Sequence, residues 1–272
     1  MGATADAVQT TIRLVNERDL DFVLFLGDLV NTPTAENVAA FAEAVRRINK
    51  PVYLTIGNHD VGRMAEGFDI EAELARDLPG PWEDGFTYAF DAGGWRFVVC
   101  SLGSFNIGYT GPQVNRFKGV VSETGGVSNV PPKHLERFTQ LLAETGEKPT
   151  CVVMHVPLVR MGRRVQARGC YSQVRLLEGM QMLSLIEARA NVKMCLYGHE
   201  HFNQADVFDG RLHLITQGVR GMDQYGDADA IRIMRIADET ITSGLIWDGL
   251  AEQSPAPLGT LEGDRAFEWR WA

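Results

Sequence analysis

Two short, continuously apolar runs with an amphipathic segment between them constrain the fold of this chain more than any other feature. Phe22–Leu26 (FVLFL) and Val52–Ile56 (VYLTI) each end at a glycine, as strands buried on both faces do. Residues 34–48, which lie between them, carry apolar side chains at helical spacing. A strand, a helix and a second strand in this order predict two parallel strands joined by a right-handed crossover.

The later part of the chain changes character and predicts antiparallel hairpins. Asp209-Gly210 between two apolar stretches is a strong signal for a type I′ turn. Parallel units followed by hairpins predict an α/β protein with two mixed sheets packed together and helices outside. Residues 1–250 would form this domain and 251–272 a C-terminal extension, in which alternating aromatic residues resemble one face of a strand. The other expected elements are helices at 5–18, 131–143 and 173–189, and strands at 86–91, 95–101, 151–154, 192–197, 207–208, 212–215, 231–237 and 240–247.

The composition excludes several classes of function. A net charge of −9 argues against a broad surface for nucleic acid or anionic membranes, although a bound metal would still permit a small anionic substrate. The chain has no apolar run of membrane-spanning length and no signal-peptide pattern, so we expect a cytoplasmic protein. The four cysteines form no C-x-x-C pair, which makes a cysteine zinc site improbable and free thiols the simple expectation.

Side chains capable of binding metal follow four of the predicted strands. They lie in Gly27-Asp28, in Gly57-Asn58-His59-Asp60, at His155 and in Gly198-His199-Glu200-His201. Ligands collect at the carboxyl ends of parallel strands, so these side chains should share one edge of the fold. Carboxylate, amide and imidazole donors together suit Mn, Fe or Zn.

Each of these segments also has an ordinary structural interpretation. A Gly-Asp pair after a strand is usually a turn or a helix cap, and His155 could equally be a hydrogen-bonded core histidine. Gly-Asn-His-Asp is the most specific segment. The combination of all four, each at a strand end, favours a metal site.

In this combination the chain resembles the calcineurin-like metallophosphoesterases, whose pattern is D-x-H, G-D-x-x, G-N-H-[DE], a later histidine and G-H-x-H. The resemblance implies a four-layer α/β/β/α sandwich with two divalent metal ions. It implies that Asp28 bridges both metals, that Asn58, His155 and His199 complete one site, and that His201 reaches the other. It also implies that His59 is the general acid, with Asp60 orienting its ring.

The chain departs from this pattern because no D-x-H precedes Asp28. The strand that precedes this motif in the family is therefore not matched, and we expect the metal served by Asp28, Asn58, His155 and His199 to bind far better than the second metal. We also expect an apolar strand ending in Asp-x-His to be encoded upstream of Met1. The unpaired edge of the strand Phe22–Leu26 should be covered by self-association or by a rearranged segment such as 264–272.

The resemblance implies hydrolysis of a small phosphoester by a metal-activated hydroxide, and we favour a phosphodiester over a phosphomonoester. Arg160 and Arg164 belong to a cluster of arginines after His155 that suits phosphate oxygens, although a solvated or subunit-contacting loop is the simpler interpretation. Two alternatives stay open: a non-catalytic interaction or scaffold protein on the same fold, and a truncated enzyme with an impaired metal site. A homo-oligomer is a further expectation.

Overall fold

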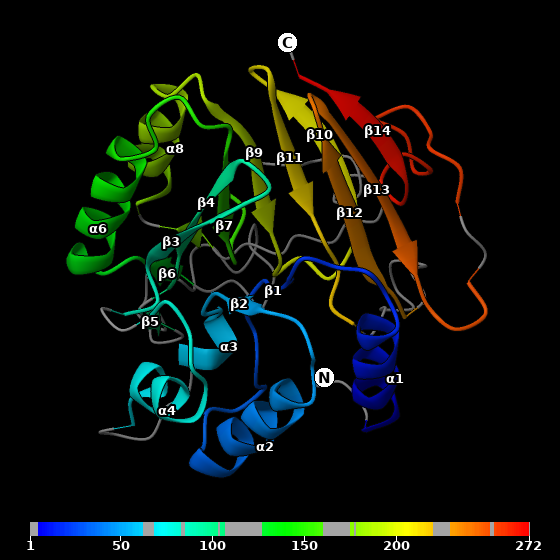
Figure 1. The fold of residues 1–272 in the computed structure, drawn as a ribbon. Helices are drawn as coiled ribbons and strands as arrows, with labels where there is room; N and C mark the ends of the chain where they lie inside the picture. The colour runs from blue at the N-terminus through cyan, green and yellow to red at the C-terminus, as the bar shows by residue number, and fades with distance from the viewer. Residues whose placement is uncertain are drawn as a thin grey trace, which may run out of the picture.

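In the computed structural model, a β core lies between two helical layers, one on each side (Figure 1). The structure describes residues 5–61, 68–82, 85–102, 104–106, 127–159, 175–176, 178–219, 229–250 and 253–271. The helices are α1 (Ala5–Asn16), α2 (Ala35–Arg46), α3 (Asn58–Val61), α4 (Ile70–Asp77), α6 (Pro132–Ala143) and α8 (Gly179–Glu187). No helix in the described ranges is both long enough and apolar enough to span a bilayer.

A six-stranded mixed sheet forms the centre, in the order β10-β11-β9-β7-β4-β3. Its strands are β3 (Tyr88–Ala92), β4 (Trp95–Cys100), β7 (Thr150–Met154), β9 (Val192–Tyr197), β10 (Gln204–Phe208) and β11 (Arg211–Ile215). Strands β4, β7, β9 and β11 are parallel, whereas β3 and β10 are antiparallel edges. The β10–β11 hairpin has positive φ at Asp209 and Gly210, which confirms the predicted turn.

The inner strands are mostly apolar because each of them packs on both faces. In β7, Cys151 and Val153 belong to the core that faces β1 and β2. Val152 and Met154 point the other way, into the core beneath α6 and α8. The alternation of strand side chains thus divides one apolar run between two cores.

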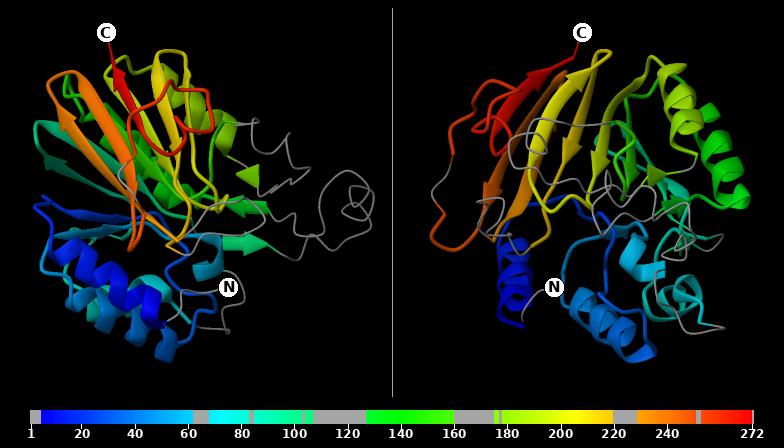
Figure 2. Two further views of the ribbon diagram at one scale, coloured as in Figure 1. Left: turned by 90° about the vertical axis from the view of Figure 1, so that its right-hand side faces the viewer. Right: turned by 180° about the vertical axis from the view of Figure 1, so that it is seen from behind.

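The second β layer consists of two separate pieces rather than one continuous sheet. Strands β1 (Val23–Phe25) and β2 (Val52–Leu54) form a parallel pair, as predicted. Strands β12 (Ile231–Ala237), β13 (Thr240–Ile246) and β14 (Phe267–Arg270) form the other piece. A cavity of about 1900 Å³ lies between them, lined by α1, β1, β12 and β13. Figure 2 shows the two pieces as distinct groups of strands.

The C-terminal segment is packed against the domain. Its alternating aromatic residues form β14, which pairs with β13, and Trp271 meets Trp95 of the central sheet edge to edge at 5.0 Å. Because β14 pairs with β13, it does not pair with the free edge of β1. The expectation that residues 264–272 cover that edge is therefore wrong.

Several elements differ from those expected from the sequence. The predicted helix at 173–189 begins at Gly179, and β8 (Arg175–Leu176) precedes it. Strand β8 joins β5 (Ser104–Asn106) and β6 (Val127–Asn129) in a small sheet that was not predicted. Three of the cysteines, Cys100, Cys151 and Cys195, are buried free thiols, and Cys170 lies outside the described residues.

Candidate metal centre

The predicted ligands come together at the carboxyl ends of four strands. Asp28 and Asn58 follow β1 and β2, and His155 and His199 follow β7 and β9 of the central sheet. Donor atoms of Asp28, His155 and His199 all lie within 4.8 Å of one another. The Asn58 Oδ1 atom is 2.9 Å from His155 Nε2 and 2.8 Å from His199 Nδ1. The sequence-based prediction that these four side chains converge is therefore confirmed.

The chemistry of these donor atoms fits a cation. The Nδ1–H of His155 donates to the carbonyl of Leu26 at 2.6 Å, so its other ring nitrogen, Nε2, faces the cluster. This Nε2 atom lies 3.3 Å from the Asp28 Oδ1 atom and 3.2 Å from His199 Nδ1. Ligating histidines usually donate their second ring N–H to a carbonyl or carboxylate in this way. The oxygens of Asp28 and Asn58 and the ring nitrogens of the two histidines thus converge on a space that a proton or a metal ion can share.

The backbone at these positions adopts a strained conformation. Asp28, His199 and His201 have φ values of 55°, 65° and 54°, in the left-handed region that residues with a Cβ rarely adopt. Strain of this kind costs of the order of 1–3 kcal/mol per residue and clusters at functional sites. Its presence at three predicted ligands supports a functional role for this loop cluster.

Gly57 is required by close packing at the centre of the site. A Cβ added there would lie 2.4 Å from the Asp28 Oδ1 atom and closer still to the Asp28 backbone nitrogen. The backbone of the second loop therefore touches the first ligand directly. This contact explains why a glycine precedes Asn58.

Burial and mutual charge determine the protonation of the ligands. Burial alone would raise the pKa of Asp28, but the neighbouring His155 holds it well below its usual range. Burial alone would lower the pKa of His155, but the Asp28 carboxylate raises it above its ordinary value. Burial, and then the like charge of His155, lower the pKa of His199 to about 3. An ionised Asp28 and a neutral His199 are the forms that bind metal.

His59 lies at the edge of the cluster. Its backbone N–H donates to the Asp28 Oδ1 atom at 2.9 Å, and its side chain lines the cavity together with Asp28 and His199. Its ring Nδ1 lies 3.4 Å from the carbonyl of Asn31. This arrangement leaves the imidazole beside the donor atoms rather than among them, which suits a group that would act on a bound molecule.

Asp60 does not orient the His59 ring, and this part of the expectation is corrected. Its two carboxylate oxygens accept backbone N–H groups from Val30, at 2.9 Å, and from Gly57, at 2.8 Å. Asp60 therefore ties the loop after β1 to the loop after β2. Burial, and then the negative charge of Asp28, raise its pKa to about 7.

His201 lies beside the cluster. Burial lowers its pKa, and the Asp28 carboxylate opposes that shift. His201 also lines the cavity, which adjoins the site. Its role as a ligand of a second metal remains a prediction. Arg160 and Arg164 lie outside the described residues, so their predicted contact with substrate also remains a prediction.

Sequence reasoning missed the contributions of the backbone. The carbonyls of Leu26 and Asn31 orient the rings of His155 and His59, yet a carbonyl leaves no signal in the residue types. The only available hint was that both precede or follow the Gly27-Asp28 turn.

The fold and the site define a class, an α/β protein with metal-type donors gathered at the carboxyl ends of its strands. The family model for calcineurin-like phosphoesterases matches residues 1–203, more than half of the chain. The chain therefore belongs to the calcineurin-like phosphoesterase family.

Curated relatives and solved structures agree with this assignment. The chain is 23% identical over 195 residues to a probable cyclic nucleotide phosphodiesterase of Coxiella burnetii, covering 71% of this chain and 64% of that protein. It is 22% identical over 183 residues to the 3′,5′-cyclic adenosine monophosphate phosphodiesterase of Haemophilus influenzae, covering 67% and 55%. The match thus spans less than two thirds of the length of either relative.

Two solved structures share the fold at low sequence identity. A dimetal phosphatase from Danio rerio aligns with a TM-score of 0.60 and 13% identity, over 89% of this chain and 85% of the other. GAP50, described as the anchor in the inner membrane complex of Plasmodium, aligns with a TM-score of 0.53 and 11% identity, over 90% and 81%. Identities this low support the fold alone.

Proposed function

We propose that this protein hydrolyses a small phosphoester, with a phosphodiester favoured over a phosphomonoester, and that it uses divalent metal bound by Asp28, Asn58, His155 and His199. The observation that carries the proposal is the convergence of acceptor atoms from four loops, with Asn58 Oδ1 2.9 Å from His155 Nε2 and 2.8 Å from His199 Nδ1. The relatives named as cyclic nucleotide phosphodiesterases support the choice of a diester.

The metal ion, His59 and Asp60 would have separate roles in the reaction. A bound Mn, Fe or Zn ion would supply Lewis-acid stabilisation of a phosphoryl oxygen and a lowered pKa of water. His59 lines the same cavity and would donate a proton to the departing oxygen, a role suited to an imidazole near neutral pH. Asp60 would keep the two ligand-bearing loops together through the N–H groups of Val30 and Gly57.

We expect one metal to bind tightly and a second to bind weakly. Asp28, His155 and His199 form a group of three donors around one point, with Asn58 beside them, whereas the described part of the chain contains no second group of three such donors that includes His201. Affinity depends on the number and geometry of the protein ligands.

The test combines metal analysis with a phosphodiester assay. The purified chain should bind Mn²⁺ or Zn²⁺ and hydrolyse a generic aryl phosphodiester, and Asp28→Asn and His199→Ala should lose both properties. Metal binding without hydrolysis of any phosphoester would favour the alternative, a non-catalytic scaffold on the same fold. Hydrolysis that survives complete metal removal would contradict the proposal.

A further inference from the structure

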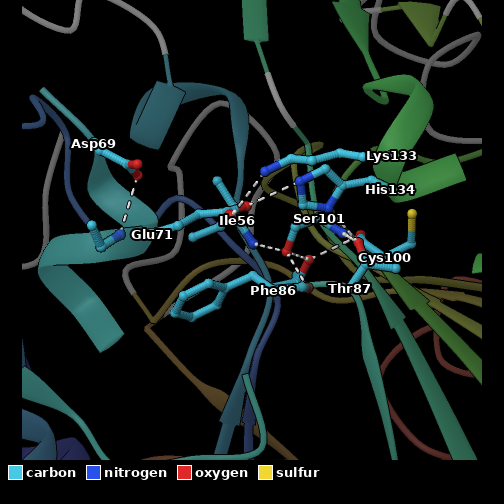
Figure 3. Close-up of polar contacts among 11 residues, drawn as sticks. Ile56, Asp69, Glu71, Phe86, Thr87, Cys100, Ser101, Lys133 and His134 are labelled. Carbon is cyan, nitrogen blue, oxygen red and sulfur yellow. Dashed lines mark hydrogen bonds and ion pairs between the residues drawn. The ribbon is translucent and has the colours of Figure 1, made fainter. Parts of the chain in front are cut away.

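The candidate metal ligands come from two different sheets, so something must hold the two halves in register. Asp28 and Asn58 follow the β1–β2 pair, and His155 and His199 follow strands of the central sheet. Where β2 and β4 end, two buried hydroxyl side chains, Thr55 and Ser101, join the sheets; we call this pair the hydroxyl clamp. Figure 3 shows Ser101 between Ile56 and Phe86.

The two side chains of the hydroxyl clamp bind the backbone of both sheets and contact each other. Ser101 Oγ accepts the N–H of Ile56 at 3.0 Å and donates to the carbonyl of Phe86 at 2.8 Å. Thr55 Oγ1 donates to the carbonyl of Cys100 at 3.0 Å and lies 3.2 Å from Ser101 Oγ. Thr55 and Ser101 are each 0% exposed, so water cannot replace these bonds.

The hydroxyl clamp acts very close to the ligands. Ile56, which it holds, lies two residues before Asn58. On the other side, Cys100 pairs with Met154 in the β4–β7 register, so Ser101 is level with His155. The separation of Asn58 Oδ1 and His155 Nε2, 2.9 Å in this structure, thus depends on how firmly the two strand ends are joined.

A second group of buried side chains supports the hydroxyl clamp from outside. Thr87 Oγ1 accepts the N–H of Ser101 at 3.3 Å and lies 2.7 Å from His134 Nδ1. His134 Nε2 in turn lies 3.4 Å from a carboxylate oxygen of Glu71 (Figure 3). Burial lowers the pKa of His134 to about 4, so the ring is neutral and can accept from Thr87 while donating to Glu71.

This Thr87–His134–Glu71 group has the residue types of a catalytic triad but serves a structural purpose. Thr87 is 3% and His134 is 4% exposed, and each of their polar side-chain atoms already has a partner. No substrate could reach the threonine hydroxyl. The group anchors α4 and α6 to the strand ends on which the hydroxyl clamp rests.

We propose that the hydroxyl clamp sets the spacing between the two halves of the metal centre, so that Thr55 and Ser101 are positioning residues for metal binding. The inference rests on the proposed function in that it takes the cluster to be a metal site. Outer residues that orient ligands typically change metal affinity by about 10- to 100-fold when they are replaced.

The experiment compares metal affinity among matched variants of the full chain. Thr55→Val removes the hydroxyl without changing the shape of the side chain, Thr55→Ser retains it, and Ser101→Ala removes the second hydroxyl. The control is Thr150→Val. Thr150 is equally buried and donates to the carbonyl of Lys148 at 2.9 Å, but it begins β7, at the end opposite to His155. Dissociation constants for Mn²⁺ and Zn²⁺ are measured by calorimetric titration, together with the free energy of unfolding.

We expect Thr55→Val and Ser101→Ala to weaken metal binding by about 10- to 100-fold, and Thr55→Ser and Thr150→Val to stay within about threefold of the wild type. Wild-type affinity in Thr55→Val or Ser101→Ala, or an equal loss in Thr150→Val, would overturn the proposal. Should Thr55→Val fail to fold, the comparison of Ser101→Ala with Thr150→Val decides. The titration measures metal binding and does not depend on hydrolysis. If the protein binds metal but cleaves no phosphoester, the proposed function is wrong. The comparison of metal affinities among the variants still tests the role of the hydroxyl clamp.

Discussion

Gly57 shows most directly how a single residue determines the geometry of the site. Its Cα hydrogen faces Asp28, and a Cβ there would lie within 2.4 Å of the Asp28 Oδ1 atom. Gly57→Ala should therefore displace the Asp28 loop and lower metal affinity at least about tenfold, because ligand placement is lost. The matched control is Gly244→Ala, since a Cβ at Gly244 meets open space. Calorimetric titration of both variants checks this, and equal affinities would contradict it.

His59 should affect turnover and leave metal binding nearly unchanged. Its contact with Asp28 is made by the backbone N–H, which His59→Ala retains. Loss of the imidazole should slow hydrolysis by about 10²–10⁴-fold for substrates with poor leaving groups, the usual range for acid–base catalysis. The loss should shrink for aryl esters, whose leaving groups need no proton. Steady-state kinetics on a series of leaving groups tests this; equal losses across the series would remove His59 from the acid role.

Most strands and the four ligand loops could be predicted from the sequence, because long apolar runs and the residues that follow them are local signals. The sequence did not predict α4, although Asp69 caps that helix by accepting the N–H of Ala72. It also did not predict the role of Asp60 or of the hydroxyl clamp. Asp60 reaches Val30, 30 positions away, and Thr55 reaches Cys100, 45 positions away, and a threonine in an apolar run does not identify its partner.

The packing of α6 and α4 on the strand ends makes the stability of the protein depend on pH. Burial, and then the charge of Lys133, lower the pKa of His134 from 6.5 to about 4. The unfolded chain therefore binds more protons than the folded one between these values. Stability from this histidine is complete above pH 6.5 and is lost as pH falls toward 4, by up to about 1.4 kcal/mol per pH unit.

Denaturant unfolding of the wild type and His134→Gln between pH 4 and 7 measures this dependence. Burial also raises the pKa of Glu71, so protonation of this carboxyl on acidification opposes the loss of stability. The variant should be less stable at pH 7 but less sensitive to acid. If the free energy of unfolding of the variant changes with pH as steeply as that of the wild type, His134 is not the cause of the pH dependence.

The cavity between β1 and β12 runs along the apolar strand β1. Phe22 to Leu26 is a continuously apolar run, yet its residues are only partly buried, and β1 pairs with β2 alone in the described sheets. The N–H of Val23 donates to the carbonyl of Pro51, and the carbonyl of Phe25 accepts the N–H of Thr55. The backbone N–H and carbonyl of Leu24, which lies between them, therefore face the edge of β1 away from β2. Exposed apolar edges of this kind promote association between chains.

We therefore expect concentration-dependent self-association, which Leu24→Pro should reduce. A proline is tolerated where the lost N–H points away from the paired edge. Val23→Pro is the matched control, because it removes the bond to Pro51 and should lower the free energy of unfolding by about 1 kcal/mol or more. Light scattering over a concentration series measures association, and a wild type that stays monomeric throughout would contradict the expectation.

Anomalous diffraction from crystals grown with Mn²⁺ or Zn²⁺ shows whether Asp28, Asn58, His155 and His199 hold a metal ion. We expect a strong anomalous peak at bonding distance, about 2.0–2.2 Å, from an Asp28 oxygen, His155 Nε2 and a His199 ring nitrogen, with Asn58 Oδ1 alongside. The absence of any peak among these atoms at saturating metal, or a peak bound only by other residues, would contradict it.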